Sequence, residues 1–297
     1  MQNRERHAYL LLCHNHLSQL LKLLELLDDP VNDIFIHIDK KSRELQQNRL
    51  LAAVQQAGIF FVSPVPVFWG GYSMIRAELR LLRAARKEGP YAYYHLISGA
   101  DLPLKSQREI HDFFREKAGK EFITFDTVGK EQGNFYDRVR YYYWLQDRIG
   151  RSGSVLANLL RLLDSKLLHL QKRLSVDRLK GKEEAFYKGD SWFSITDDLA
   201  RYVLEQKPFI RRHFRFSLCA DEIFLQTIVM NSLFRDRVEP LSTRFIDWDR
   251  GNPYVFKTAD YEQLAASPKL FARKFDETKD NEIILRIGRM VKERTGQ

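Results

Sequence analysis

Apolar residues follow two alternating periods along the first 125 residues of the chain. Short continuous apolar runs, typical of buried strands, alternate with stretches in which apolar residues recur every three or four positions, as in amphipathic helices. This alternation predicts parallel β-α-β units and an α/β fold. We expect strands at residues 7–13, 33–38, 59–62, 93–97 and 122–125, helices at 17–27, 42–57 and 107–117, and a further helix capped by Ser73 and ending near Lys87.

The pattern changes between residues 138 and 182, where the chain becomes basic and mostly helical. An aromatic run, Tyr141-Tyr-Tyr-Trp144, precedes residues 155–174, in which leucines and basic residues recur at helical spacing. The segment carries eleven Lys and Arg against three Asp, so its net charge of +8 accounts for most of the chain's +9. We interpret it as an insertion that lies on an anionic membrane surface, binds nucleic acid, or packs on the core as a solvated helix.

After residue 185 the mixed pattern resumes. A strand is expected at residues 192–195, followed by a helix that Thr196 caps and that ends near residue 206. A second helix begins around residue 221, and a strand follows at 244–246. Since no repeat or low-complexity linker divides the 297 residues, we expect a single domain.

Composition places the chain in a reducing compartment. The only two cysteines, Cys13 and Cys219, lie in apolar runs, where a buried thiol is the usual state, and they are too few for a disulfide framework. The first seven residues lack the order of a signal peptide, and no apolar run approaches the length of a membrane span. We therefore expect a cytoplasmic protein.

An acidic pair, Asp221-Glu222, interrupts the otherwise apolar segment 216–230, and Arg244 and Lys274 follow it. A carboxylate at the edge of a core can deprotonate a hydroxyl, while nearby cations can stabilise an anionic leaving group. These residues indicate group transfer from a phosphorylated donor. Acidic residues at the start of a helix also cap its free N–H groups, which is the commoner role on spacing alone.

Several familiar motifs are missing from the sequence, which argues against P-loop enzymes, zinc enzymes and α/β hydrolases. It has no Gly-rich phosphate loop, no Cys/His zinc spacing and no Gly-x-Ser-x-Gly nucleophile turn. The turn at residues 98–104, which contains Asp101, follows a predicted strand. Ligands bind at such positions in open α/β sheets, although Gly and Pro also serve an ordinary turn.

Two pairs of residues could hold a metal ion. His37 and Asp39 end the second predicted strand, and Asp247 and Asp249 follow the strand at 244–246. Residues two apart in a strand face the same side, so each pair could converge on one cation. Neither pair is specific, because His37 could equally be a buried interior histidine, Asp39 a turn residue, and the second pair part of a plain loop.

A set of motifs occurs in order along nearly the whole chain. Together they resemble the core-2/I-branching β-1,6-N-acetylglucosaminyltransferases and the peptide O-xylosyltransferases, a glycosyltransferase family 14-like group, especially in its bacterial type. The resemblance is weakest from about residue 141 to 182. The motifs are Ala8-Tyr-Leu-Leu-Leu12, His37-Ile-Asp-Lys-Lys-Ser42, Trp69-Gly-Gly-Tyr-Ser73, Leu96-Ile-Ser-Gly-Ala-Asp-Leu-Pro-Leu104, Lys188-Gly-Asp-Ser-Trp192, Asp221-Glu-Ile-Phe-Leu-Gln-Thr227, Arg244-Phe-Ile-Asp-Trp248 and Phe271-Ala-Arg-Lys-Phe-Asp276.

The resemblance implies a GT-A-like fold and an inverting transfer of a sugar, GlcNAc or xylose, from a UDP-sugar to an acceptor hydroxyl. By position, Glu222 matches the general base, while Arg244 and Lys274 match the residues that contact the donor diphosphate. The resemblance places His37 and Asp39 on the nucleotide side, and we add Asp101 to the donor-binding candidates. Members of the N-acetylglucosaminyl branch work without a metal, so neither a metal nor a further cofactor is expected. A metal-dependent transferase is the alternative.

The remaining expectations concern the acceptor and the partners. Lys188, Trp192 and Trp248 are candidates for acceptor binding, although both tryptophans could equally pack in the core. We expect residues 1–128 to form a nucleotide-binding half and residues 185–297 an acceptor-binding and catalytic half. The acceptor would be a glycan or glycolipid in surface glycan synthesis, reached from the cytoplasmic membrane face through the basic insertion. Because the excess charge is confined to that insertion, nucleic acid is not expected, and a non-catalytic basic binding module is the weakest alternative.

Overall fold

Two β-sheets organise the chain in the computed structural model, which describes all residues except 1–4, 127–131, 182–183, 240 and 297. The larger sheet has the strand order β3-β2-β1-β4-β7-β6-β8, and the smaller has the order β5-β10-β9. The strands are β1 (His7–Cys13), β2 (Asn32–Ile38), β3 (Gly58–Phe61), β4 (Tyr93–Ser98), β5 (Asp101–Pro103), β6 (Glu121–Ile123), β7 (Phe193–Thr196), β8 (Val238–Glu239), β9 (Arg244–Ile246) and β10 (Phe271–Arg273).

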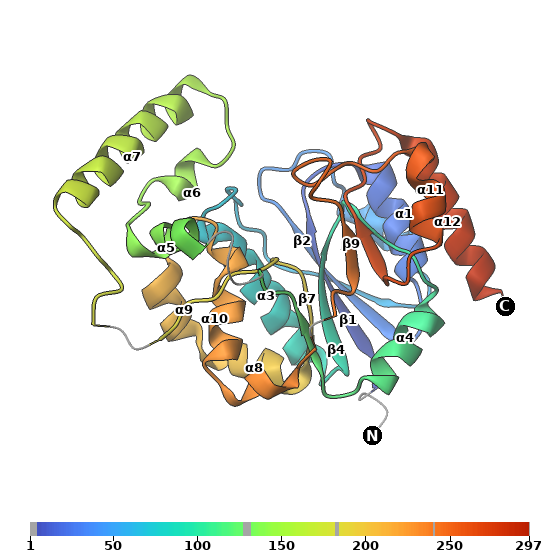
Figure 1. The fold of residues 1–297 in the computed structure, drawn as a ribbon. Helices are drawn as coiled ribbons and strands as arrows, with labels where there is room; N and C mark the ends of the chain where they lie inside the picture. Colours follow the sequence, from blue (N-terminus) through green and yellow to red (C-terminus); the bar gives the residue numbers. More distant parts are fainter. Residues whose placement is uncertain (1–4, 127–131, 182–183, 240, 297) are drawn as a thin grey trace.

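Helices cover both faces of the larger sheet (Figure 1). Side chains alternate across β1: Tyr9 and Leu11 pack with the leucines of α1 and the isoleucines of α12, while Ala8 and Leu10 pack with α3. The strand is buried on both sides, as its unbroken apolar run predicts. The α-helices are α1 (Leu17–Leu27), α2 (Gln47–Leu51), α3 (Tyr72–Glu88), α4 (Gln107–Glu116), α5 (Gln132–Arg140), α6 (Gln146–Ile149), α7 (Val155–Arg173), α8 (Asp197–Glu205), α9 (Lys207–Phe214), α10 (Phe224–Met230), α11 (Tyr261–Ala265) and α12 (Asn281–Thr295).

The direction of the strands brings several loops to one edge of the sheet. Strand β1 pairs in parallel with β2 and β4, whereas β7 is antiparallel to β4, with His95 opposite Ser194. The start of β7 therefore lies beside the carboxyl end of β4. In the smaller sheet, Arg273 at the end of β10 lies opposite Asp101 at the start of β5. Loops that are distant in sequence thus meet where parallel α/β sheets usually bind ligands.

The sheets and their helices form the α/β architecture that the sequence predicts. The basic insertion is also helical, as expected, and α7 extends along the outside of the molecule, well away from both sheets (Figure 1). Helix α6 attaches the insertion to the body, because Gln146 donates a hydrogen bond to the Trp69 carbonyl at 2.7 Å. Within the described residues, no helix combines the length and apolarity needed to cross a bilayer.

Two predictions of local structure are wrong, both because a contact distant in sequence intervenes. The helix expected at residues 42–57 is only α2, since the backbone N–H groups of residues 55, 56 and 57 donate to the Asp28 carboxylate instead of continuing a helix. Ser73 does not cap α3, which begins at Tyr72. Its hydroxyl instead donates to Asp147 of α6 at 2.8 Å.

Candidate active site

The turn after β4 is joined to β10 by a buried ion pair. The Asp101 carboxylate accepts a hydrogen bond from the Arg273 guanidinium at 2.8 Å and another from the Ser98 backbone N–H at 2.6 Å. The same guanidinium donates to the Ser98 hydroxyl and lies 4.1 Å from the centre of the Trp192 ring. Three of the sequence motifs therefore meet at Arg273, a residue that sequence analysis did not single out. Trp192 is thus packed against a cation, and its predicted contact with the acceptor remains a prediction.

A second set of contacts ties the loop before β7 to the acidic pair. The Gly189 backbone N–H donates to the Glu222 carbonyl at 2.9 Å, and the Ser191 hydroxyl donates to the Asp221 carboxylate at 2.8 Å. A Cβ atom on Gly189 would lie 1.9 Å from the Thr124 carbonyl oxygen, so only glycine allows the loop to approach this closely. The loop thereby holds the backbone and one side chain of the acidic pair in place.

Glu222 is presented at the surface with one oxygen free. It lies in the short 3₁₀ helix η2 (Ala220–Glu222), and its side chain is 32% exposed. Its Oε2 accepts a hydrogen bond from Arg138 of α5 at 2.7 Å, whereas Oε1 makes no hydrogen bond with any described residue. The interpretation of the acidic pair as a helix cap is wrong, because Asp221 and Glu222 bind side chains and no backbone N–H group of the following helix.

Behind Glu222 lie two buried carboxyl groups. Asp221 is 4% exposed, and its Oδ1 has no hydrogen-bond partner; Glu78 of α3 is 2% exposed, and neither of its oxygens has one among the described residues. Burial raises the pKa of Asp221 to about 6, and the adjacent Glu222 charge acts in the same direction. Burial also raises the pKa of Glu78 well above its usual value, reinforced by the charge of Asp221. Burial thus favours the protonated form of Glu78.

His37 and Asp39, the predicted donor-side residues, lie at the end of β2 and in the turn that follows it. His37 is buried and accepts a hydrogen bond from the Val65 backbone N–H at 3.0 Å, and burial lowers the pKa of His37 to about 4, which keeps it neutral. Asp39 accepts hydrogen bonds from the backbone N–H groups of Lys41 and Val67. Both side chains shape the turn after β2, and a direct contact with a nucleotide stays a prediction.

Lys274 follows Arg273 at the end of β10. It is half-buried, and its ammonium group forms no hydrogen bond or ion pair in the part of the chain that the structure describes. Burial lowers the pKa of His14, and the charge of Lys274 lowers it further, so the two side chains are electrostatic neighbours at the end of β1. The ammonium therefore lies near the loop that follows β1.

Arg244 occupies a different environment from Lys274. Its side chain is 7% exposed, and its Nη2 donates to the carbonyls of Leu96 and Phe193 at 3.0 and 2.8 Å. Burial lowers the pKa of Arg244 to about 10, which still leaves it charged at pH 7. The guanidinium thus joins β4 to β7 in the interior. The structure does not bring it to an open surface with Lys274, and its contact with a diphosphate remains untested.

Three further candidates lie in loops. The Lys188 ammonium forms an ion pair with Asp126. Trp248 is 52% exposed and therefore does not belong to the core. Asp247 accepts hydrogen bonds from two backbone N–H groups of its own turn and pairs with Arg250, which is the arrangement of a plain loop. Among the described residues there is also no cluster of three or more His, Cys, Asp or Glu that could hold a metal ion.

Comparison with known proteins identifies the family. A family model described as "Core-2/I-Branching enzyme" matches residues 7–268. The chain belongs to this family. Human xylosyltransferase 2 is 25% identical over 94% of the chain, and human xylosyltransferase 1 is 24% identical over 95% of it. The chain spans about a third of the length of these relatives, at 33% and 30% respectively.

Two solved structures resemble this Core-2/I-Branching family member more remotely. Mouse xyloside xylosyltransferase 1 in its apo form aligns with a TM-score of 0.38 and 11% identity, over 89% of this chain and 96% of its own. The galactosyltransferase LgtC, in complex with donor and acceptor sugar analogues, aligns with a TM-score of 0.47 and 9% identity, over 97% of this chain and 95% of its own. The family assignment rests on the family match alone.

Sequence analysis of this family member missed three residues of the site. In the sequence Arg138 is one of the many basic residues of the insertion, and Arg273 stands next to Lys274 in the same motif. The burial of Glu78 is predictable from the sequence. Its position falls on the same apolar stripe of α3 as Ile75 and Leu79.

We expect Glu78→Gln to make stability less dependent on pH. A carboxyl whose pKa is raised on folding contributes stability at low pH that is lost as pH rises from its unfolded pKa through its folded pKa. Glutamine cannot ionise, so the variant should unfold roughly 2 °C or more above wild type at pH 8, with the difference shrinking toward pH 5. Thermal unfolding at both pH values measures this. Glu88→Gln, at an exposed position of the same helix, is the control, and an unchanged pH dependence in Glu78→Gln would contradict the assignment.

Proposed function

We propose that the protein is an inverting glycosyltransferase that moves a sugar from a UDP-sugar to an acceptor hydroxyl, with Glu222 as the general base. The observation that carries the proposal is the state of the Glu222 carboxylate. It is half-exposed, its Oε2 is held by Arg138, and its Oε1 is open at the edge where the family motifs converge. A general base needs this combination of a fixed position and a free lone pair within reach of the substrate.

Inversion requires the acceptor hydroxyl to attack the anomeric carbon on the face opposite the leaving UDP. Glu222 would take the hydroxyl proton as the new glycosidic bond forms and the bond to the diphosphate oxygen breaks. The departing diphosphate gains negative charge, which a fixed cation can stabilise. Lys274, whose ammonium is unpaired within the described chain, is the first candidate for this role.

Glu222→Gln should bind UDP as wild type does but lose transfer activity by about 10²–10⁴-fold, because the amide cannot accept the proton. Turnover with a UDP-sugar and isothermal titration with UDP measure the two properties separately. Glu239→Gln, which removes an ion-paired glutamate on β8, is the matched control and should remain active. Turnover near the wild-type rate in Glu222→Gln would refute the assignment of the base.

Lys274→Met should weaken UDP binding by about tenfold, which is the effect of losing one charge-assisted hydrogen bond. Titration calorimetry with UDP measures the change. Lys279→Met removes an exposed lysine of the neighbouring turn and should leave the affinity unchanged. An affinity for UDP that is equal in wild type and Lys274→Met would exclude a role for this ammonium in binding the diphosphate.

Transfer without a metal is part of the proposal, because fixed cations can supply the positive charge that a metal otherwise provides. We therefore expect full activity in the presence of EDTA. Loss of activity in EDTA that Mn²⁺ restores would instead favour the metal-dependent alternative, with His37 and Asp39 or Asp247 and Asp249 as ligands. Substituting each pair would then identify which one binds the ion.

The names of the relatives make UDP-xylose the first donor to test, with UDP-GlcNAc second on the resemblance seen in the sequence. The donor pocket selects through contacts with one or two hydroxyls, so a comparison of ligands is required. A thermal-shift series with UDP, UDP-xylose, UDP-GlcNAc and UDP-glucose compares them directly. For the acceptor we propose a glycan or glycolipid in surface glycan synthesis, with the enzyme bound peripherally to the cytoplasmic face of a membrane.

A further inference from the structure

Helix α7 presents a stripe of leucines to solvent. The stripe repeats at intervals of three, four, seven and four positions, which places its members on one side of an α-helix. Their exposed fractions range from 48% to 67%. The leucine stripe consists of Leu156, Leu159, Leu163, Leu170 and Leu174.

The same type of stripe is buried elsewhere in this protein. In α1 the leucines at positions 20, 23, 24 and 27 are all 0% exposed, because the sheet and α12 cover them. In α7 the fully buried side chains are instead Ala157 and Gln171, roughly 100° around the helix from the leucine stripe. Gln171 is fastened to the Tyr142 backbone through two hydrogen bonds, at 2.8 and 2.9 Å. The helix is thus attached by a polar side and leaves its apolar side uncovered.

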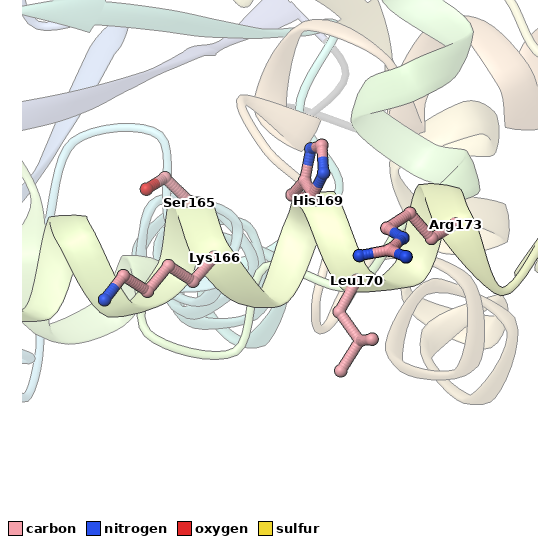
Figure 2. Close-up of a pocket in the computed structure, with 5 residues that line it drawn as sticks. All are labelled: Ser165, Lys166, His169, Leu170 and Arg173. Carbon is pink, nitrogen blue, oxygen red and sulfur yellow. The ribbon is translucent and has the colours of Figure 1, made fainter.

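Basic residues lie alongside this stripe. Lys166, His169 and Arg173 line a surface hollow on α7 together with Ser165 and Leu170 (Figure 2). None of the three forms a hydrogen bond or an ion pair within the described chain, so their donors are available to a ligand. Since the whole insertion has a net charge of +8, the surface complements an anionic partner.

We propose that α7 docks flat on an anionic lipid surface. The leucine stripe would enter the boundary between headgroups and acyl chains, with Lys166 and Arg173 at the lipid phosphates. At 19 residues the helix would lie along about 28 Å of the surface. A second copy of the chain is a less suitable partner for the leucine stripe, because two strongly basic insertions would repel each other. The proposal rests on the peripheral membrane binding proposed above and specifies the surface responsible, but it does not depend on sugar transfer.

Flotation of the full chain with vesicles tests the docking. Wild type should bind vesicles of phosphatidylcholine mixed with phosphatidylglycerol, should bind phosphatidylcholine alone at least about tenfold less tightly, and should be released by salt. The double variant Leu159→Glu/Leu163→Glu should lose at least about tenfold in affinity for the mixed vesicles, because two apolar side chains no longer enter the lipid. The double variant Lys166→Glu/Arg173→Glu should lose a similar factor in affinity for the mixed vesicles, because two cations that face the anionic lipid become anions.

The control is Leu233→Glu, which places a single glutamate at a leucine that is 93% exposed outside the insertion and should bind as wild type does. All variants should keep the wild-type thermal shift with UDP, which separates this proposal from the assignment of the active site. Three results would overturn it: no binding of wild type to the mixed vesicles, unchanged binding by the leucine variant, or a wild-type dimer in size-exclusion chromatography that the leucine variant dissociates. The last result would make the stripe a contact between two copies of the chain.

Discussion

The ion pair between Asp101 and Arg273 is the interaction that assembles the functional edge of this protein. Asp101 begins β5 and Arg273 ends β10, so the pair fixes the smaller sheet against the turn that follows β4. Both side chains are largely withdrawn from water, where an unpaired charge would be costly and a paired one is held firmly. Because Trp192 packs on the same guanidinium, the loop that supports the acidic pair takes its position from this contact.

A second buried cation reinforces this edge from inside. Arg244 donates to carbonyl groups at the end of β4 and the start of β7, where neighbouring strands run in opposite directions. It therefore stabilises the junction between the parallel and antiparallel parts of the larger sheet. Arg244 is the residue that the resemblance assigns to the donor diphosphate, and Arg273 stands beside Lys274 in sequence, yet both guanidinium groups donate hydrogen bonds to oxygen atoms of the protein itself. Of the three, only Lys274 forms no ion pair or side-chain hydrogen bond with a residue that the structure describes.

Elements that depend on neighbouring residues are predictable from the sequence, whereas contacts between residues distant in sequence are not. Helix α1 begins and ends where its apolar period does, and Thr196 caps α8, because both depend on neighbouring residues only. The shortening of α2 and the role of Ser73 depend on Asp28 and Asp147, whose positions no local pattern reveals. The site follows the same division. Motifs pointed to the acidic pair and to the turns that surround it, whereas the pairing of Glu222 with Arg138 required the tertiary structure.

The contacts that attach the insertion also connect it to the acidic pair. Gln146 of α6 donates a hydrogen bond to the Trp69 carbonyl. In the same loop the Gly70 carbonyl accepts a hydrogen bond from the backbone N–H of Cys219, two residues before the acidic pair. A surface bound by α7 would therefore be connected to the acidic pair through these two hydrogen bonds. Glu222 would then lie at a fixed distance from the membrane surface. Only acceptor hydroxyl groups at that distance would reach it, so the length of a lipid-linked acceptor would decide whether a sugar is added to that acceptor.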